Sequence, residues 1–483
     1  HEGGREKSGE PAPLPCAQRG GRGWGMGGNP SAQVPSPNSL FVDPLLPRLT
    51  PQNISATLTA ISTRPLRVSG GETVTLEFEK VVAQVARMGR ALAARSASLD
   101  ERSALAWERL ALLGDVDAVR VRVALARARD AGFRGAALLD EPANRSYPLP
   151  PLPPRATILA ADGSQVYPNP HAAALYYLIN VGVFVYHHGA DALPEQITEP
   201  QLHYSDTALH DTNGQLITNA AVNARRSVQE LALLARESWA RADCAGPLLA
   251  ITDGPLLFWM DKDVPDRKQL EAEYLGWLVN LHDLHANRSA HGESVSLLGY
   301  VDRPASTFLI SLLHLMSLDE ADVRAPALKS SGDLEGLTDQ ALLFRLLKPG
   351  ERSALLVQQS PRNKDYHDKD AKYEIACFYL NVSSGPPYHL ARVEVPLWVA
   401  GNPALVDAAH ALVYDQCQLM WRYPYALTRA DELAVVRNQE RTQLNELIEI
   451  ELRRHAQEVA HSEKLDSKVV RHGRTRYGQG RQK

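Results

Sequence analysis

Two short apolar runs that each end on an aspartate and a glycine form the most regular pattern in the chain. Residues 156–161 stop at Asp162-Gly163, and residues 248–252 stop at Asp253-Gly254. Runs of this length and β-branched content are typical of buried strands, and Asp-Gly is a turn signal. The pattern predicts two strands that end on aspartates, at the edge of the sheet where open α/β folds bind ligands.

Strand and helix patterns alternate around these two runs. Strands are predicted at 175–186, 199–205, 294–301, 354–358, 375–382 and 390–396, the last two as a hairpin. Helices are predicted at 219–242, 266–286, 306–318, 403–420 and 428–455, with a helical connection over 319–352. This order predicts an α/β fold in which a mixed β-sheet is flanked by helices.

The two ends of the chain differ from this central region, which we place at residues 155–440. Residues 1–52 are rich in Gly, Pro, Ser and Arg, and we expect a disordered tail. Helical spacing within 53–147 predicts a helical arm of two long helices, which would form a dimer contact or another interface. Residues 441–455 complete the last helix, and 456–483 form a flexible basic tail.

Composition limits the classes of protein and the compartment. A net charge of −4 gives no overall basic field, so a nucleic-acid partner would need local basic patches. The four cysteines are widely spaced and form no CxxC pair, which argues against a zinc knuckle and fits a reducing compartment. No apolar run has the length of a membrane span, and the start lacks a secretory signal. We therefore expect a cytoplasmic protein, although the chain begins at His1 and its true N-terminus stays open.

The two strand-terminal aspartates are the leading candidates for a metal site. Carboxylates at adjacent strand ends suit Mg²⁺ or Mn²⁺, which prefer hard oxygen ligands. Two such ions about 3.5–4 Å apart can bind both the attacking and the leaving oxygen of a phosphodiester. The alternative is that Asp162 and Asp253 only form turns with the glycines that follow them.

Three more acidic residues have both a functional and a structural interpretation. Glu230 lies near the apolar face of the helix at 219–242, where it would bind a metal or pair with Arg226 four residues earlier. Asp302 ends a third strand and would join the cluster, cap a helix or pair with the arginine that follows. Asp431 lies in the predicted first turn of the last helix, where the helix dipole favours it, or it faces the metal cleft.

Other common catalytic patterns are absent from the sequence. It contains no HExxH, P-loop or GxSxG motif. His187-His188 is interpreted as a loop pair and His410 as a structural residue within a helix. A carboxylate-pair hydrolase that acts on sugars is a further alternative, and metal dependence would distinguish it from a metal-dependent phosphodiesterase.

Several short motifs together resemble those of the NurA nucleases. In chain order they are 162–164 (Asp-Gly-Ser), 253–256 (Asp-Gly-Pro-Leu), 300–304 (Tyr-Val-Asp-Arg-Pro), 391–396 (Ala-Arg-Val-Glu-Val-Pro) and 423–427 (Tyr-Pro-Tyr-Ala-Leu). Each motif is short, but their order and strand context make the set specific. The resemblance extends over about residues 155–440.

The resemblance implies an RNase H-like core and a Mn²⁺-dependent nuclease site, with Mg²⁺ as a possible substitute. It further implies 5′–3′ degradation of DNA ends, cutting of single strands, a homodimer, and cooperation with HerA, a hexameric ATPase, in end resection for double-strand break repair. No membrane partner is implied.

The family's functional residues can be carried over to positions of this chain. The metal ligands fall on Asp162 and Asp253, and the helix glutamate falls on Glu230, with Glu237 as a rival. The late tyrosine falls on Tyr423. Many members have a histidine where this chain has Asp431. We expect Asp431 to bind the metal.

Three residues are predicted to contact DNA, namely Tyr300, Arg303 and Tyr425. The presence of Asp431 in place of the family's histidine supports an alternative. In it, the chain is a catalytically inactive DNA-binding or motor-docking subunit on the same fold.

Overall fold

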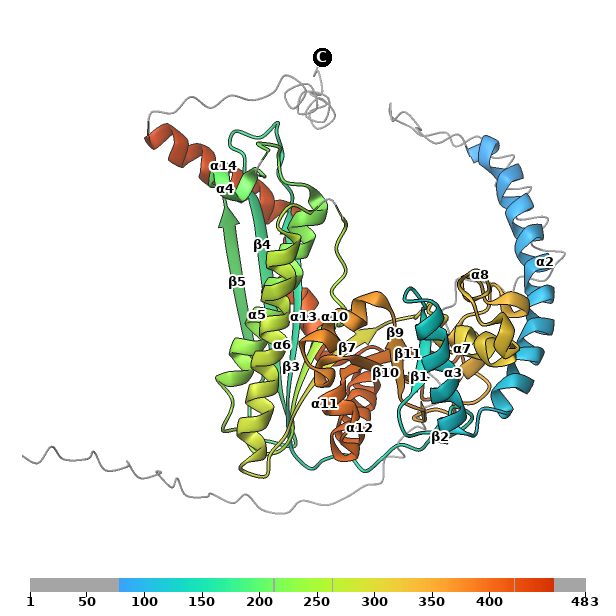
Figure 1. Ribbon diagram of the computed structural model, residues 1–483. Coiled ribbons are helices and arrows are strands. Elements are labelled where there is room, and N and C mark those ends of the chain that lie inside the picture. The colour runs from blue at the N-terminus through green and yellow to red at the C-terminus, as the bar shows by residue number, and fades with distance from the viewer. Residues whose placement is uncertain (1–77, 212, 263, 421, 456–483) are drawn as a thin grey trace, which may run out of the picture. The chain divides into compact units, whose positions relative to one another are not determined.

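The computed structural model describes residues 78–211, 213–262, 264–420 and 422–455 (Figure 1). The predicted tails at 1–52 and 456–483 lie outside these residues. The chain divides into two compact units, His1–Arg90 and Ala91–Lys483. Only the start of one helix is described in the first unit, and the fold below is that of the second.

The helices longer than one turn are α2 (Phe78–Ala111), α3 (Val116–Arg129), α5 (Asn219–Trp239), α6 (Arg267–Ser289), α7 (Phe308–Ser317), α9 (Asp339–Leu343), α10 (Pro361–Lys369), α12 (Pro403–Leu419), α13 (Tyr425–Ala434) and α14 (Asn438–Arg454). Single turns are α4 (Asp206–Leu209), α8 (Ala325–Leu328) and α11 (Leu397–Ala400). No described helix is both long and apolar enough to cross a membrane.

The strands are β1 (Gly135–Leu138), β2 (Ser146–Tyr147), β3 (Ala156–Val166), β4 (Tyr177–His188), β5 (Glu195–His203), β6 (Leu248–Asp253), β7 (Val295–Val301), β8 (Arg352–Ser353), β9 (Leu356–Gln359), β10 (Ile375–Asn381) and β11 (Leu390–Pro396). They form one sheet whose main order is β1-β9-β10-β11-β7-β6-β3-β4-β5. β3, β6 and β7 are parallel, whereas β3-β4-β5 and β10-β11 are antiparallel. The prediction of a mixed sheet with an RNase H-like core is confirmed.

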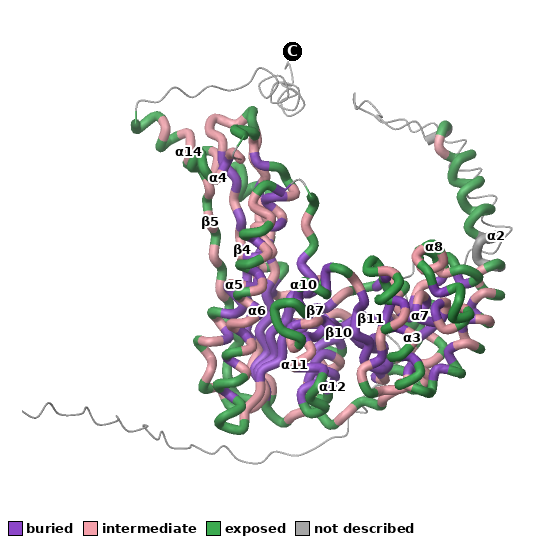
Figure 2. The backbone as a smooth tube through the Cα atoms, viewed as in Figure 1, coloured by how far each residue is buried: buried purple, intermediate pink, exposed green. Residues whose placement is uncertain are grey.

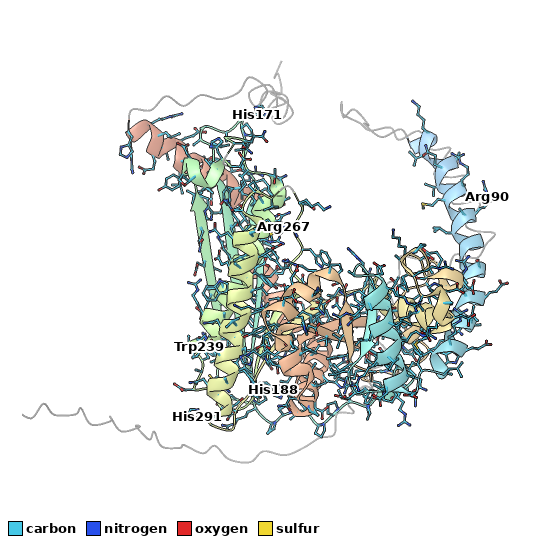
Figure 3. The ribbon with its side chains drawn as sticks, viewed as in Figure 1. Arg90, His171, His188, Trp239, Arg267 and His291 are labelled. Atoms are coloured by element: carbon cyan, nitrogen blue, oxygen red, sulfur yellow. The ribbon has the colours of Figure 1, made fainter. Side chains whose placement is uncertain are left out.

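Helices cover both faces of the sheet, because successive side chains of its central strands point to opposite sides. Leu159 and Ala161 of β3 belong to the core beneath α5 and α6, whereas Ile158 and Ala160 belong to the core beneath α12 and α13. Figure 2 shows the buried central strands between these layers. In Figure 3, Arg267 lies near one end of α6, and His291, just after α6, lies near its other end. Trp239, at the end of α5, lies beside the middle of α6, where its Nε1 donates to the carbonyl oxygen of Asn280 at 3.3 Å.

The first predicted strand does not end where its sequence suggests. Asp162 was expected at the strand's end, but β3 continues to Val166, and its ladder with β4 runs without a break through Asp162 and Gly163. The hydrogen bonds of an eleven-residue antiparallel pairing override the turn preference of Asp-Gly. For the same reason, His187 and His188 lie at the end of β4 and not in a loop.

Two other predicted elements differ from the structure. The helix expected over 428–455 is two helices, because the backbone leaves the helical region at Val435, with φ −57° and ψ 122°. α14 begins only after Arg437, whose N–H donates to the Glu440 carboxylate at 2.7 Å. The 53–147 arm is not helical throughout, because β1 and β2 lie within it and pair with β9 and β8 of the main sheet. The expected hairpin is confirmed as β10-β11.

Candidate active site

One polar cavity brings together carboxylates from four elements. Asp162 of β3, Glu230 of α5, Asp253 of β6 and Asp431 of α13 all line this cavity, which measures about 440 Å³. We call it the acidic pocket. Its size is typical of a small-ligand site. The fold therefore gathers the four predicted metal ligands, although they are separated by up to hundreds of residues in the chain.

Asp162 reaches the pocket from the interior of a strand. Its carboxylate accepts a hydrogen bond from the Gly163 N–H at 2.7 Å. A Cβ atom at position 163 would lie 2.5 Å from Oε1 of Glu230 and 3.0 Å from Cγ of Arg226. Gly163 thus lets α5 approach β3 closely enough to place Glu230 in the pocket, and the Asp-Gly pair does not form a turn here.

Asp253 reaches the pocket from a true strand end. The chain turns after it, and the Gly254 N–H donates to the carbonyl oxygen of Tyr300 at 2.8 Å. The Tyr423 hydroxyl hydrogen-bonds to the Asp253 carboxylate and lowers its pKa, opposing desolvation, which raises it more. The predicted late tyrosine therefore lies beside the second aspartate.

A buried glutamate holds the loop that follows Asp253. Glu394 of β11 accepts hydrogen bonds from the Leu256 N–H at 2.9 Å and from Nε2 of Gln358 at 2.7 Å. It also pairs with Arg392 at 2.9 Å, and only 1% of its side chain is exposed. Buried charges persist when they are paired and hydrogen-bonded. Glu394 is thus the reason why the loop after β6 has a fixed path.

The protein around the pocket disfavours negative charge on its acids. Burial, opposed by the charge of Arg226 and reinforced by the charges of Asp162 and Asp253, raises the pKa of Glu230 to about 8. Burial also raises the pKa of Asp162 to about 6, against the hydrogen bond from Gly163. Crowded carboxylates with raised pKa values are typical of functional sites, where a cation or a proton must offset their repulsion.

Arg226 is the one basic side chain among the residues that line the acidic pocket. Its Nε lies 3.0 Å from Oε1 of Glu230, and its guanidinium donates to Gln165 at 3.0 Å. The predicted i,i+4 pair therefore forms, and Glu230 lines the pocket as well. Glu237, the rival, instead pairs with Arg241 at 2.8 Å and does not line the pocket.

The donor set fits a hard divalent cation in its chemistry. Four carboxylates are the oxygen ligands that Mg²⁺ and Mn²⁺ prefer. Oε1 of Glu230 is buried, and it has the ion pair with Arg226 but no hydrogen bond of normal geometry. Within the described ranges, however, no three His, Cys, Asp or Glu side chains are placed closely enough to hold one ion.

Three predicted residues are placed differently from expectation. Tyr300 was expected to contact DNA, but this prediction is wrong because the side chain is completely buried. Its hydroxyl donates to the carbonyl oxygen of Arg422. Asp302 does not line the pocket, and its structural alternative forms instead, because it pairs with Arg303 at 3.8 Å and also with His389. Asp431 lies late in α13, not in a first turn, so the helix-dipole interpretation is wrong.

Arg303 and Tyr425, the other predicted DNA contacts, stay predictions. The Arg303 side chain is exposed and its backbone has a φ of 46°, in the left-handed region. Tyr425 is half-buried, with its ring edge-on to Phe184 at 5.6 Å and to Tyr186 at 5.9 Å.

Sequence reasoning missed Trp259, which lines the acidic pocket, and assigned no role to Glu394. The signal for Trp259 was its place six residues after Asp253 in an apolar run that includes an aromatic pair, Phe258-Trp259. The motif that contains Glu394 was noticed only as part of the resemblance, because a carboxylate that binds a distant loop leaves no local pattern.

Comparison with known proteins gives consistent matches. The chain resembles the crystal structure of the NurA nuclease from Sulfolobus solfataricus at 11% identity, over 78% of this chain and 98% of that one, with a TM-score of 0.45. It resembles a crystal structure of NurA with manganese at 9% identity, over 63% and 91% of the two chains, with a TM-score of 0.34. It resembles the crystal structure of the catalytic domain of human endonuclease V at 15% identity, over 67% of this chain and 95% of that one, with a TM-score of 0.28.

The comparison with curated proteins found no match. The NurA domain family model, by contrast, matches residues 156–436, which is more than half of the chain and includes all four carboxylates of the acidic pocket. The chain belongs to the NurA domain family.

Proposed function

We propose that this protein is a metal-dependent nuclease that hydrolyses phosphodiester bonds of DNA in the acidic pocket. The observation that carries the proposal is the convergence of Asp162, Glu230, Asp253 and Asp431 from four separate elements on one cavity. Their proximity raises the free energy of the charged pocket, which a divalent cation would lower. Membership of the NurA domain family supports the same activity.

The four carboxylates would hold Mn²⁺ or Mg²⁺, which supplies charge neutralisation and Lewis-acid activation for phosphodiester hydrolysis. The Tyr423 hydroxyl would orient Asp253, to which it is already bonded. Arg226 would leave Glu230 and compensate the charge of the scissile phosphate, because its guanidinium lines the same pocket. Arg303 and Tyr425 would contact the DNA outside the pocket.

The finer function follows from the family resemblance. We propose degradation of DNA ends in the 5′–3′ direction and cutting of single strands, by a homodimer that works with a HerA-type hexameric ATPase in end resection. Light scattering tests the homodimer, and co-purification tests the complex with the ATPase.

Degradation of end-labelled single- and double-stranded DNA in Mn²⁺, Mg²⁺ or EDTA tests the proposal. Wild-type protein should cut only with a metal, and Asp162→Asn and Asp253→Asn should each lower the rate at least about 100-fold. Glu230→Gln should do the same, whereas Glu237→Gln on the same helix is the matched control and should keep full activity. Retained cutting in Asp162→Asn and Asp253→Asn would refute the site.

A catalytically inactive, DNA-binding subunit is the second candidate. The ion pair between Arg226 and Glu230 favours it, because this pair neutralises a carboxylate that a metal would need. The same assay separates the two candidates. Binding of DNA without cutting by the wild type, with and without a HerA-type ATPase, would establish the second.

A further inference from the structure

Trp259 is the part of the acidic pocket that phosphodiester hydrolysis does not use. It lines the same cavity as Asp162 and Asp253, and 54% of its surface is exposed. The other tryptophans whose surroundings the structure describes (Trp107, Trp239, Trp277, Trp398) are each partly buried. A large, flat aromatic surface is therefore presented to solvent beside the carboxylates.

The fold holds this indole in place through the residue before it. The Phe258 N–H donates to the hydroxyl of Tyr366 at 2.9 Å, and the Phe258 carbonyl accepts from Nε of Arg362 at 2.8 Å. The Phe258 ring stacks on Tyr274, with centroids 4.6 Å apart and planes at 14°. Because the preceding backbone and ring are fixed, Trp259 has a defined position, and binding would require little ordering.

A cation lies next to the indole. The Arg134 guanidinium carbon is 5.8 Å from the centre of the Trp259 ring, within the range of a cation–π contact. Arg134 is exposed, and none of the described carboxylates forms an ion pair with it. An aromatic ring beside an uncompensated arginine combines a surface for a nucleobase with a charge for a phosphate.

We propose that Trp259 is a stacking platform for one unpaired nucleobase of the substrate, and that Arg134 contacts a phosphate beside it. This inference rests on the proposed nuclease function and assigns two residues that would position its single-stranded substrate. In a duplex each base is covered on both faces by its neighbours, so only a single strand or a frayed end offers a free face. The acidic pocket itself repels phosphates, so affinity must come from groups outside the carboxylates.

Fluorescence anisotropy with short labelled oligonucleotides tests the platform. Binding is measured with Ca²⁺ for the wild type, Trp259→Ala, Trp259→Phe and Tyr204→Ala; Tyr204 is an exposed aromatic, 71% exposed, outside the acidic pocket. Trp259→Ala should weaken single-strand binding about 5-fold or more, and Trp259→Phe should weaken it less because a ring remains. Tyr204→Ala should bind as the wild type does.

A set of oligonucleotides that each carry one abasic position provides a second arm, which needs no variant. In the wild type, one abasic position should weaken binding by about the factor seen for Trp259→Ala. This sensitivity should shrink in Trp259→Phe, which keeps a ring, and disappear in Trp259→Ala. Indifference of the wild type to every abasic position would overturn the platform, even if Trp259→Ala failed to fold.

Cleavage with Mn²⁺ by the same preparations separates the two proposals. Wild type that cuts DNA, together with Trp259→Ala that binds single strands equally tightly, would overturn the platform and leave the nuclease intact. Wild type that neither cuts nor binds DNA would overturn both.

Discussion

The two Asp-Gly pairs share a sequence pattern but occupy different structures. Asp162-Gly163 lies inside a strand, where Gly163 is needed because a Cβ atom would meet Glu230 at 2.5 Å. Asp253-Gly254 ends a strand, where Gly254 has a φ of +98° and open space around the position of a Cβ atom. The first glycine is required for its missing side chain and the second for its backbone.

This difference shows that two motifs with the same sequence can place a carboxylate in one pocket from different backbone structures, a strand interior and a strand end. Asp162 lies within the ladder between β3 and β4, which continues past it to Val166, whereas Asp253 is the last residue of β6 and its position also depends on the loop that follows it. Variants can therefore disturb one aspartate and spare the other.

The largest effect on stability is expected for Glu394→Ala. This change would leave Arg392 buried without its partner and the Leu256 N–H without an acceptor, so the free energy of unfolding should fall by about 3–5 kcal/mol. Hydrogen exchange should increase in the loop after Asp253 and stay unchanged near Asp162. Urea unfolding measures the change in the free energy of unfolding. Glu199→Ala, which breaks an exposed ion pair to Arg236, is the control and should lower this free energy by less than about 1 kcal/mol.

Alanine at each glycine should separate the two motifs. Gly254→Ala should lower the free energy of unfolding by about 1–3 kcal/mol, because alanine disfavours its backbone conformation. Gly163→Ala should instead reduce cleavage strongly, because the added methyl group displaces the Glu230 carboxylate. Thermal unfolding and cleavage rates measured side by side check this, and full activity in Gly163→Ala would contradict the close approach.

The pH dependence of stability should report the buried carboxylate beside the first motif. The pKa of Glu230 is about 8 in the folded protein, above its ordinary value of 4.5. The folded state thus holds the proton more tightly, so without metal stability falls as pH rises from about 4.5 to 8. Glu230→Gln should remove this part of the fall and raise the melting temperature at pH 8 by roughly 2 °C or more.

Differential scanning fluorimetry in EDTA from pH 5 to 8 checks this expectation. Glu237→Gln is the control, and it should follow the wild type. The smaller fall caused by Asp162, whose pKa is about 6, should persist in both variants. Identical curves for Glu230→Gln and the wild type would contradict the raised pKa.

The smallest effect is expected for Tyr423→Phe, which touches only the second motif. Loss of the hydroxyl removes a hydrogen bond that lowers the pKa of Asp253. The acidic limb of the pH–rate profile should move upward by up to about one pH unit, since a hydrogen bond contributes about 0.5–1.5 kcal/mol. An unchanged limb would show that Asp253 does not limit the rate at low pH.

The fold could be predicted further than the site geometry. Apolar runs and helical spacing located β3, β4, β6, β7, the β10-β11 hairpin and α5, because each buries a regular stripe of side chains. The end of β3 could not be predicted, because partner strand β4, more than ten residues away, extends it past Asp162. The break at Val435 left no glycine or proline signal.

The site's residues could be named, but not their surroundings. Asp162, Asp253 and Asp431 follow from the motifs, whereas Glu230 was assigned from its helix with Glu237 as a rival; the structure places all four at the pocket. The choice of Glu230 over Glu237 depends on which turn of α5 faces Gly163, which only three-dimensional packing decides. The roles of more distant groups such as Glu394 depend on contacts across the sheet.

Titration of Mn²⁺ by calorimetry at pH 8 tests most directly whether the two Asp-Gly motifs serve one metal site. The titration compares the wild type with Asp162→Asn, Asp253→Asn and the double variant, all shown to be folded by circular dichroism. We predict that the wild type binds Mn²⁺, that each single variant loses at least about tenfold in affinity, and that the double variant loses little more than the weaker single. Mn²⁺ binding that is unchanged in either single variant would contradict the shared site.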